Sequence, residues 1–364
     1  MSDVLPEKRY KALFLYNGER SQAYKRVQDG TGHSAGFWGM VHLPQFGIDA
    51  RFVEFEQYVP VSLARFLRRY IFRNIYFVHV LFYPLFFSYD IIFTSSAFGT
   101  QLVHTLLGFR KPIWIMHDFS ISSLVGNGTT RKQKIFRYLV RRSAGIVTIG
   151  REETEKLKVL FPEMVDRVTY IPFGVDLAFF KRQKGLDDGT ILAVGFDPDR
   201  DWKTLVEAVR GTPLKVVIAT RPSRLAGIDL PSNVTHRTFT QQELIDAYAS
   251  ARVIAIPMDT SKGVNDAMGC STLFEAMSMG KAIVATNTHT FASYIEDGVQ
   301  GLLVPERDVA ALRSALLRAQ GDTALNEALG EHAYQYAVTY LDVVKLTGEL
   351  AAFFKRILAM RSSV

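Results

Sequence analysis

A run of small residues stands immediately before a segment that we predict to be helical: Gly269, Cys270, Ser271 and Thr272. The start of a helix leaves backbone N–H groups without partners, and such groups bind anions, phosphates above all. Glu275, about one helical turn further on, carries a carboxylate that can accept hydrogen bonds from a vicinal diol such as a ribose. Together these features indicate a nucleotide site, although small residues before a helix are also typical of an ordinary cap.

The neighbouring segments favour the nucleotide interpretation. An apolar run over residues 253–257 precedes the small residues, and a second strand-like run over residues 281–286 follows the helix. Strand, loop, helix and strand in this order predict a βαβ unit, and such units bind ligands at the carboxyl ends of their strands.

Two stretches of this region resemble a known family. The sequences LFEAMSMGKAIVAT (273–286) and YIEDGVQGLLVPERD (294–308) resemble the C-terminal donor-binding domain of the family 4 glycosyltransferases, which are retaining enzymes of the GT-B fold. The resemblance implies an α/β fold with two Rossmann-like doubly wound domains facing across a cleft, and a C-terminal helix that crosses back to the first domain. It also implies transfer of a hexose-like sugar from a nucleoside diphosphate sugar, with retention of configuration.

The chain departs from the family pattern at two places. A second Glu usually stands eight residues before the helix Glu, where this chain has Ala267; the neighbouring Asp266 could contact the donor sugar instead, or the role is absent. In the family, the glycine that ends the first strand of this domain is followed by an Arg and later by a Lys, and here the first of these cations is replaced by Phe196. The remaining candidates for binding the diphosphate are Arg200, with help from Lys203 or Arg221.

The length of 364 residues suits two domains. We predict an N-terminal Rossmann-like domain on the acceptor side (1–176), a nucleotide-sugar-binding domain (188–340) and a returning C-terminal helix (341–364). Strand-like apolar runs recur along the chain at 11–16, 50–55, 90–94, 112–116, 145–150, 168–172, 190–195 and 214–220.

His117 and Asp118 follow the predicted strand over residues 112–116. They are therefore expected at the carboxyl edge of a sheet, where open α/β domains bind ligands. The resemblance nominates His117 for a place against the donor sugar, with Asp118 as a nearby carboxylate. The alternative is that the pair caps the following loop.

Composition restricts the compartment and the partners. A single cysteine excludes an intramolecular disulfide, and residues 1–9 do not read as a signal peptide, so we expect a cytoplasmic protein. Residues 1–180 hold 23 basic against 15 acidic residues, a net charge of +8, whereas the remainder is close to neutral. Because no nucleic-acid-binding motif accompanies this excess, we expect the first domain to meet an anionic membrane surface on the cytoplasmic side.

Two basic segments carry that expectation. In the first segment, arginines recur at helical spacing beside aromatic residues: Arg65, Arg68, Arg69 and Arg73. An uncharged aromatic run over residues 75–87 follows, which is too short to span a bilayer. A second segment interleaves basic and apolar residues: Arg131, Lys132, Lys134, Arg137, Arg141 and Arg142. The alternative is that the aromatic residues fill the core while the arginines coat the surface.

The resemblance thus implies a glycosyltransferase of polysaccharide or glycolipid synthesis that uses no cofactor besides its nucleotide-sugar donor and acts on a saccharide or lipid-linked acceptor. No Asp-x-Asp metal motif is evident in a suitable loop, and GT-B enzymes generally use cationic and amide groups in place of a metal, so activity should survive EDTA. Two alternatives stay open: a nucleotide-sugar 2-epimerase on the same fold, and a non-catalytic subunit that binds a sugar nucleotide or a membrane.

Overall fold

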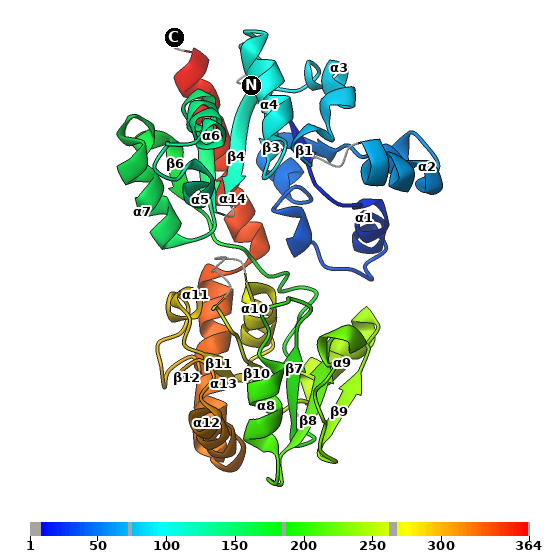
Figure 1. The fold of residues 1–364 in the computed structure, drawn as a ribbon, viewed down its shortest axis with the longest axis vertical. Helices are drawn as coiled ribbons and strands as arrows, with labels where there is room; N and C mark the ends of the chain where they lie inside the picture. The colour runs from blue at the N-terminus through cyan, green and yellow to red at the C-terminus, as the bar shows by residue number, and fades with distance from the viewer. Residues whose placement is uncertain (1–8, 72–74, 119, 184–186, 262–267, 363–364) are drawn as a thin grey trace, which may run out of the picture. The chain divides into compact units, whose positions relative to one another are not determined.

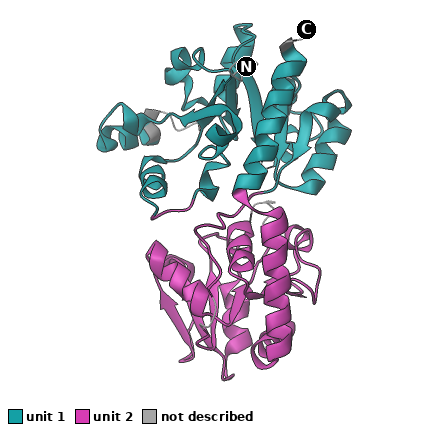
Figure 2. Cartoon of the chain, turned by 180° about the vertical axis from the view of Figure 1, so that it is seen from behind, with its two compact units in different colours: residues 1–30, 34–172, 344–364 teal, residues 31–33, 173–343 magenta. Residues whose placement is uncertain are grey.

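The computed structural model describes residues 9–71, 75–118, 120–183, 187–261 and 268–362, and the chain forms two compact units (Figures 1 and 2). The first unit contains Met1–Gly30, Ser34–Pro172 and Val344–Val364, and the second contains Thr31–His33 and Phe173–Val343. Each unit is built on one six-stranded sheet.

The sheet of the first unit is parallel throughout, with the strand order β2-β1-β3-β4-β5-β6. Its strands are β1 (Tyr10–Leu15), β2 (Ile48–Phe52), β3 (Ile91–Thr94), β4 (Ile113–Asp118), β5 (Gly145–Thr148) and β6 (Val168–Tyr170). Both faces of this sheet are covered. On β1, Ala12 and Phe14 contribute to one hydrophobic core, whereas Leu13 and Leu15 contribute to another. A strand that is buried on both faces must be apolar at successive positions, which explains the short continuous apolar runs in the sequence.

Helices of the first unit complete these cores. They are α1 (Ser21–Gln28), α2 (Val61–Phe66), α3 (Tyr83–Phe86), α4 (Phe98–Leu106), α5 (Ile121–Val125), α6 (Arg131–Arg142) and α7 (Arg151–Leu160). The final helix, α14 (Val343–Ser362), packs Leu350, Phe353 and Phe354 into the core that contains Ala12 and Phe14. The C-terminal helix therefore returns to the first unit, as the resemblance implied.

The second unit repeats the arrangement with the parallel order β12-β11-β10-β7-β8-β9. Its strands are β7 (Thr190–Val194), β8 (Lys215–Ala219), β9 (Val234–Arg237), β10 (Val253–Ile256), β11 (Ala282–Thr286) and β12 (Leu302–Val304). Its helices are α8 (Trp202–Val209), α9 (Gln241–Ser250), α10 (Cys270–Ser278), α11 (His289–Ala292), α12 (Val309–Gly321) and α13 (Thr323–Tyr340). Side chains of α9 and α10 pack on one face of the sheet, and those of α8 and α12 pack on the other.

The two doubly wound parallel sheets confirm the predicted fold class. The segment between β1 and β2 includes short 3-10 turns at Ala35–Phe37 and Leu43–Phe46. Gly39 and Gly47 have φ angles of 85° and 78° in this region, and such left-handed backbone ends a helix. Within the described residues, no helix combines the length and the apolar character needed to cross a lipid bilayer.

Candidate functional site

The turn before α10 depends on Gly269. This residue is the N-cap of the helix and has a left-handed φ of 75°. A Cβ atom at this position would lie 2.5 Å from Cζ of Phe291, so the space as well as the backbone excludes a side chain. Among the residues that follow, Cys270 and Thr272 are buried while Ser271 is exposed. The small residues predicted to form a phosphate turn thus form the start of a nine-residue helix after β10.

Arg200 is held against the first turn of this helix. Its Nη2 donates a 2.9 Å hydrogen bond to Oγ1 of Thr272, and that hydroxyl lies 3.4 Å from the backbone oxygen of Val194, to which it can donate. The side chain of Arg200 is only 1% exposed, and a Cβ atom on Gly195 would lie 2.1 Å from its Nε. Glycine at the end of β7 therefore makes room for the guanidinium at the carboxyl edge of the sheet.

Two donors of this guanidinium have no acceptor among the described residues. Nε and Nη1 of Arg200 are buried and make no hydrogen bond there, although Oδ2 of Asp197 lies 3.6 Å from Nε. Burial lowers the pKa of Arg200 from its usual value, with Asp197 acting in the opposite direction. A buried guanidinium with unused donors is a costly arrangement in the free protein, and an anion in reach of those donors would offset that cost.

Glu275 is paired with a residue that the sequence did not single out. The hydroxyl of Tyr248, on α9, donates a 2.9 Å hydrogen bond to Oε2 of Glu275. Burial raises the pKa of Glu275 to about 7, while Tyr248 and Arg200 oppose that shift. Burial also raises the pKa of Tyr248 well above its usual value, with Glu275 as the next cause.

Arg200, Thr272, Glu275 and Tyr248 therefore belong to one connected cluster at the start of α10. The sequence predicted three of the four. Tyr248 follows the helical spacing of the buried residues Ile245 and Ala249 on α9, and that spacing predicts core packing with no sign of a polar role.

The other predicted cations of this unit lie at the surface. Lys203 is exposed in the first turn of α8. Arg221 follows β8, and its Cζ lies 6.0 Å from the ring centroid of Phe196, which is 52% exposed. A guanidinium thus lies over the aromatic residue that replaces the first cation of the family pattern. Asp266, the predicted substitute for the missing Glu, lies outside the described residues.

His117 is buried at the carboxyl end of β4 in the first unit. Its ring lies 4.5 Å from the ring of Trp38 and 5.0 Å from that of Phe93, measured between centroids. Burial lowers the pKa of His117 to about 3, so its imidazole is neutral at physiological pH.

Asp118 holds the turn that leads into α5. Its Oδ1 accepts hydrogen bonds of 2.6 Å from the backbone N–H groups of Ser120 and Ile121. Burial, and next the neighbouring carboxylate of Glu153, raise the pKa of Asp118 well above its usual value. This is the loop-capping arrangement considered as the alternative for the pair, and a catalytic role for Asp118 stays a prediction.

The first predicted basic segment forms α2 and the short π-helical segment Leu67–Ile71 after it. Arg65 and Arg69 are exposed, as are Phe66 at 50% and Tyr70 at 60%, whose ring centroids are 5.0 Å apart. Arg73 and the side chain of Arg68 lie outside the described part of the chain. The aromatic run that follows divides between the two interpretations, since Phe82 and Phe86 are buried while Leu81, Leu85 and Phe87 are exposed.

The second basic segment forms α6, which begins with a capping box between Thr130 and Gln133. Several of its cations are used within the unit. Arg137 donates to the backbone oxygen of Gly126 at 3.0 Å, and Arg141 forms a 2.8 Å ion pair with Glu163. Arg131, Lys132, Lys134 and Arg142 are exposed.

Metal ligands do not gather in the described part of the chain, where no three His, Cys, Asp or Glu residues are grouped so as to hold an ion.

Comparison with known proteins finds a family match within the second unit. Residues 197–322 match the family model described as glycosyl transferases group 1. A D-inositol 3-phosphate glycosyltransferase of Saccharomonospora viridis is 31% identical, over 66% of this chain and 62% of the relative. A protein of the same name from Corynebacterium urealyticum is 28% identical, over 38% of this chain and 34% of the relative. The chain thus spans less than two thirds of the length of these curated relatives.

Solved structures resemble the whole chain. Sucrose-phosphate synthase of Thermosynechococcus elongatus superposes with a TM-score of 0.70 at 16% identity, covering 97% of this chain and 100% of that one. HepE of Anabaena in complex with UDP-glucose gives a TM-score of 0.67 at 13% identity, covering 98% of this chain and 100% of that one. At these identities the likeness shows a common fold.

Proposed function

We propose that this chain is a glycosyltransferase of the group 1 family with the GT-B fold, and that it transfers a glycosyl group from a nucleoside diphosphate sugar to an acceptor. The donor class is supported by the cluster at the start of α10 and by the sugar nucleotide held by HepE of Anabaena.

The diphosphate of the donor is assigned to Arg200 and to the first turn of α10. Nε and Nη1 of Arg200 are donors without an acceptor in the described residues, and they lie beside the N-terminus of a helix. As the bond to the sugar breaks, negative charge develops on the leaving diphosphate. A fixed guanidinium and backbone N–H groups at a helix start stabilise that charge without having to reorganise. The burial of Arg200 with unused donors is the observation that carries the proposal.

The ribose of the donor is assigned to Glu275. Its Oε2 accepts from Tyr248, which leaves lone pairs on the carboxylate for the two hydroxyls of a diol. The nearby charge of Arg200 opposes the rise in the pKa of Glu275, and this proximity supports assigning neighbouring parts of one nucleotide to the two residues. A basic group for phosphate beside an acidic group for ribose fits a nucleotide better than it fits a free sugar phosphate.

His117 is proposed to contact the transferred sugar from the first unit. Because its imidazole is neutral, it offers a hydrogen bond without a positive charge that would oppose the developing oxocarbenium character of the sugar. We further propose that the sugar is a hexose transferred with retention, and that charge stabilisation by Arg200 and the helix start makes a metal unnecessary.

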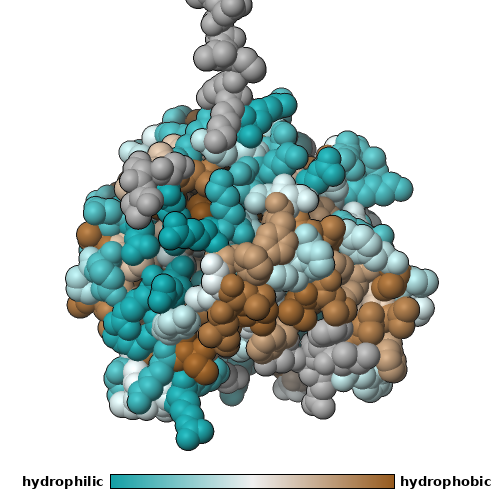
Figure 3. Space-filling model, turned by 90° about the horizontal axis from the view of Figure 1, so that it is seen from above, coloured by the Kyte–Doolittle hydropathy of each residue, from teal (hydrophilic) through white to brown (hydrophobic). Residues whose placement is uncertain are grey.

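We also propose that the acceptor is associated with a membrane. Figure 3 shows hydrophobic side chains gathered on one face of the molecule. The first unit exposes large apolar side chains on and after α2, and cations stand among them: Leu63, Phe66 and Tyr70, with Arg65 and Arg69. Aromatic residues interleaved with arginines are typical of segments that lie in the headgroup region of a membrane. A lipid-linked saccharide held at such a surface would be within the reach of a peripheral enzyme.

Thermal unfolding in the presence of UDP, GDP, ADP or CDP tests the donor assignment. A ligand that binds the folded state raises the melting temperature by mass action, so at least one of the four nucleotides should do so. The matching sugar nucleotide, incubated with the enzyme but without an acceptor, then separates transfer from 2-epimerisation. We expect no isomer of the donor, and formation of an isomer would favour an epimerase.

A further inference from the structure

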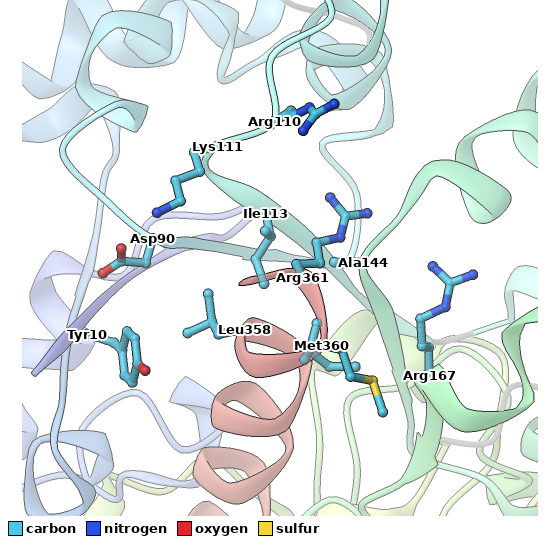
Figure 4. Close-up of a pocket in the computed structure, with 11 residues that line it drawn as sticks. Tyr10, Asp90, Arg110, Lys111, Ile113, Ala144, Arg167, Leu358, Met360 and Arg361 are labelled. Atoms are coloured by element: carbon cyan, nitrogen blue, oxygen red, sulfur yellow. The ribbon is translucent and has the colours of Figure 1, made fainter. Parts of the chain in front are cut away.

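A cavity lies at the opposite edge of the first sheet from His117. Its volume is about 570 Å³, and its lining includes Tyr10 at the start of β1, Asp90 just before β3 and Ile113 at the start of β4 (Figure 4). These residues mark the amino ends of the strands, whereas His117 and Asp118 lie at the carboxyl end of β4. The last turns of α14 close the cavity with Leu358 and Arg361. The cavity is therefore separate from the proposed catalytic site.

Basic residues dominate the charged lining of this cavity. The single carboxylate in the lining is that of Asp90. Four cations from three segments of the chain also line the cavity: Arg110, Lys111, Arg167 and Arg361. Oδ2 of Asp90 accepts a 2.9 Å hydrogen bond from the backbone N–H of Lys11. Arg167 donates to backbone oxygens of Ser143 and Glu163 at 3.3 and 3.2 Å. Its charge is thus not compensated by those contacts, since carbonyl oxygens are neutral acceptors.

The remaining cations have no ion pair within the described residues. Arg110 and Lys111 are exposed at the rim, and Arg361 lies on the last turn of α14. Burial lowers the pKa of Arg361 from its usual value, and the like charge of Arg167 lowers it further. Two guanidinium groups that repel one another across a cavity would both be stabilised by an anion placed between them.

The cavity also offers apolar contacts. Ile113, Ile357 and Leu358 are buried in its wall, and Met360 is 40% exposed. Immediately before Arg110 and Lys111, the chain exposes large apolar side chains: Leu106 at 70%, Leu107 at 57% and Phe109 at 46%. Phe109 packs against Phe87, another exposed residue, with 4.9 Å between ring centroids. A charged pocket thus opens beside an apolar surface.

We propose that this cavity binds a phosphate group, and that the adjoining apolar side chains favour a phosphate carried by a lipid. Arg110, Lys111, Arg167 and Arg361 provide the donors, and the apolar wall accommodates the part of the ligand next to the phosphate. The proposal does not rest on the transferase activity, because no residue of the cluster around Arg200 lines the cavity.

The first test measures binding of inorganic phosphate and of glycerol 3-phosphate to the full chain by calorimetry. We expect Arg110→Gln combined with Arg361→Gln to weaken binding about tenfold or more, since each charged hydrogen bond contributes on the order of one such factor. A matched control, Lys215→Gln combined with Arg318→Gln, removes the same charge from exposed positions of the second unit and should leave the affinity within about twofold.

A variant that is expected to bind phosphate more tightly separates loss of the site from loss of the fold. Asp90→Asn removes the one carboxylate of the lining and keeps an oxygen that can accept from the N–H of Lys11. Phosphate should bind several times more tightly to this variant, as expected when a nearby like charge is removed. A destabilised protein would not show that gain.

Vesicles identify the source of the phosphate. The same variants are sedimented with vesicles of phosphatidylglycerol in phosphatidylcholine and with vesicles of phosphatidylcholine alone. Loss of binding to the anionic vesicles together with loss of phosphate affinity in the Arg110 and Arg361 variant supports a lipid headgroup, whereas loss of phosphate affinity alone supports a soluble phosphate ester. Equal phosphate affinities in the wild type, the double variant and the Asp90→Asn variant would overturn the proposal.

Discussion

The guanidinium of Arg200 donates from Nη2 to the hydroxyl of Thr272 across 2.9 Å, and this contact joins the loop after β7 to the first turn of α10. The two residues are 72 positions apart in the sequence. Because Thr272 fixes one end of the guanidinium, the direction of the other N–H groups is fixed as well. This contact therefore positions the positive charge of Arg200 before the sugar nucleotide binds.

Thr272→Val tests whether that contact positions the arginine. Valine has the shape of threonine but cannot accept the hydrogen bond, so Arg200 loses its fixed direction and the variant should bind its nucleoside diphosphate about tenfold more weakly. Thr272→Ser keeps the hydroxyl and should restore most of the affinity. If valine and serine had equal effects on the dissociation constant, the hydroxyl would have no positioning role.

Gly269→Ala tests the backbone of the same turn. Alanine at a φ of 75° is strained, and its Cβ would lie 2.5 Å from Cζ of Phe291. We expect a loss of about 2 to 4 kcal/mol in the free energy of unfolding, measured by urea denaturation. The double variant with Phe291→Leu should lose less than the sum of the two single variants, because the smaller side chain relieves the clash. Strict additivity would show that the clash does not matter.

Glu275→Gln should separate stability from function. The carboxyl group titrates near 4.5 in the unfolded chain and at about 7 in the folded one, so the folded state binds the extra proton between these values. The stabilisation from this protonated carboxyl is present below pH 4.5 and is lost as pH rises to 7. Glutamine stays neutral, so the variant should match the wild type at pH 4.5 and exceed its free energy of unfolding at pH 8 by about 1 to 3 kcal/mol.

The same variant should bind the donor more weakly at pH 8, because an amide is a poorer acceptor for two ribose hydroxyls than a carboxylate. Greater stability together with weaker binding is typical of a residue kept for function. If the variant were less stable than the wild type at pH 8, the claim that burial makes the ionised form of Glu275 unfavourable would be wrong.

Much of the fold could be predicted from the sequence because parallel strands buried on both faces leave a direct trace. Short apolar runs such as residues 190–195 and 253–257 were predicted as strands and form β7 and β10. β9 was missed, since Val234 is its one buried residue and its pattern is therefore weak. The path of the chain after Trp38 does not follow from hydrophobic spacing, because the left-handed glycines Gly39 and Gly47 determine it.

The candidate site was predictable only where local spacing determines it. The phosphate turn and Glu275 belong to one continuous helix, so their proximity follows from the sequence. The hydrogen bond from Tyr248 to Glu275 joins α9 to α10, and no local pattern indicates a contact between residues 27 positions apart. The burial of Arg200 was likewise hidden, because its loop reads as polar and exposed.

Membrane contact by the first unit predicts a charge-dependent association with vesicles. Arg65→Glu combined with Arg69→Glu should reduce sedimentation with anionic vesicles about tenfold or more, since each basic residue near the surface contributes on the order of 1 kcal/mol. Lys215→Glu combined with Arg318→Glu changes the charge equally in the second unit and is the control. Unchanged sedimentation of the first variant would end the membrane assignment for α2.

The most direct measurement is the dissociation constant of the nucleoside diphosphate that stabilises the protein, determined by calorimetry for the wild type, Arg200→Gln and Lys203→Gln. Arg200 is buried against the start of α10, whereas Lys203 is exposed on α8, so we predict a loss of about tenfold to a hundredfold for the first variant and a smaller loss for the second. Affinity that is unchanged in folded Arg200→Gln, or the absence of binding by any of the four nucleotides, would contradict the account.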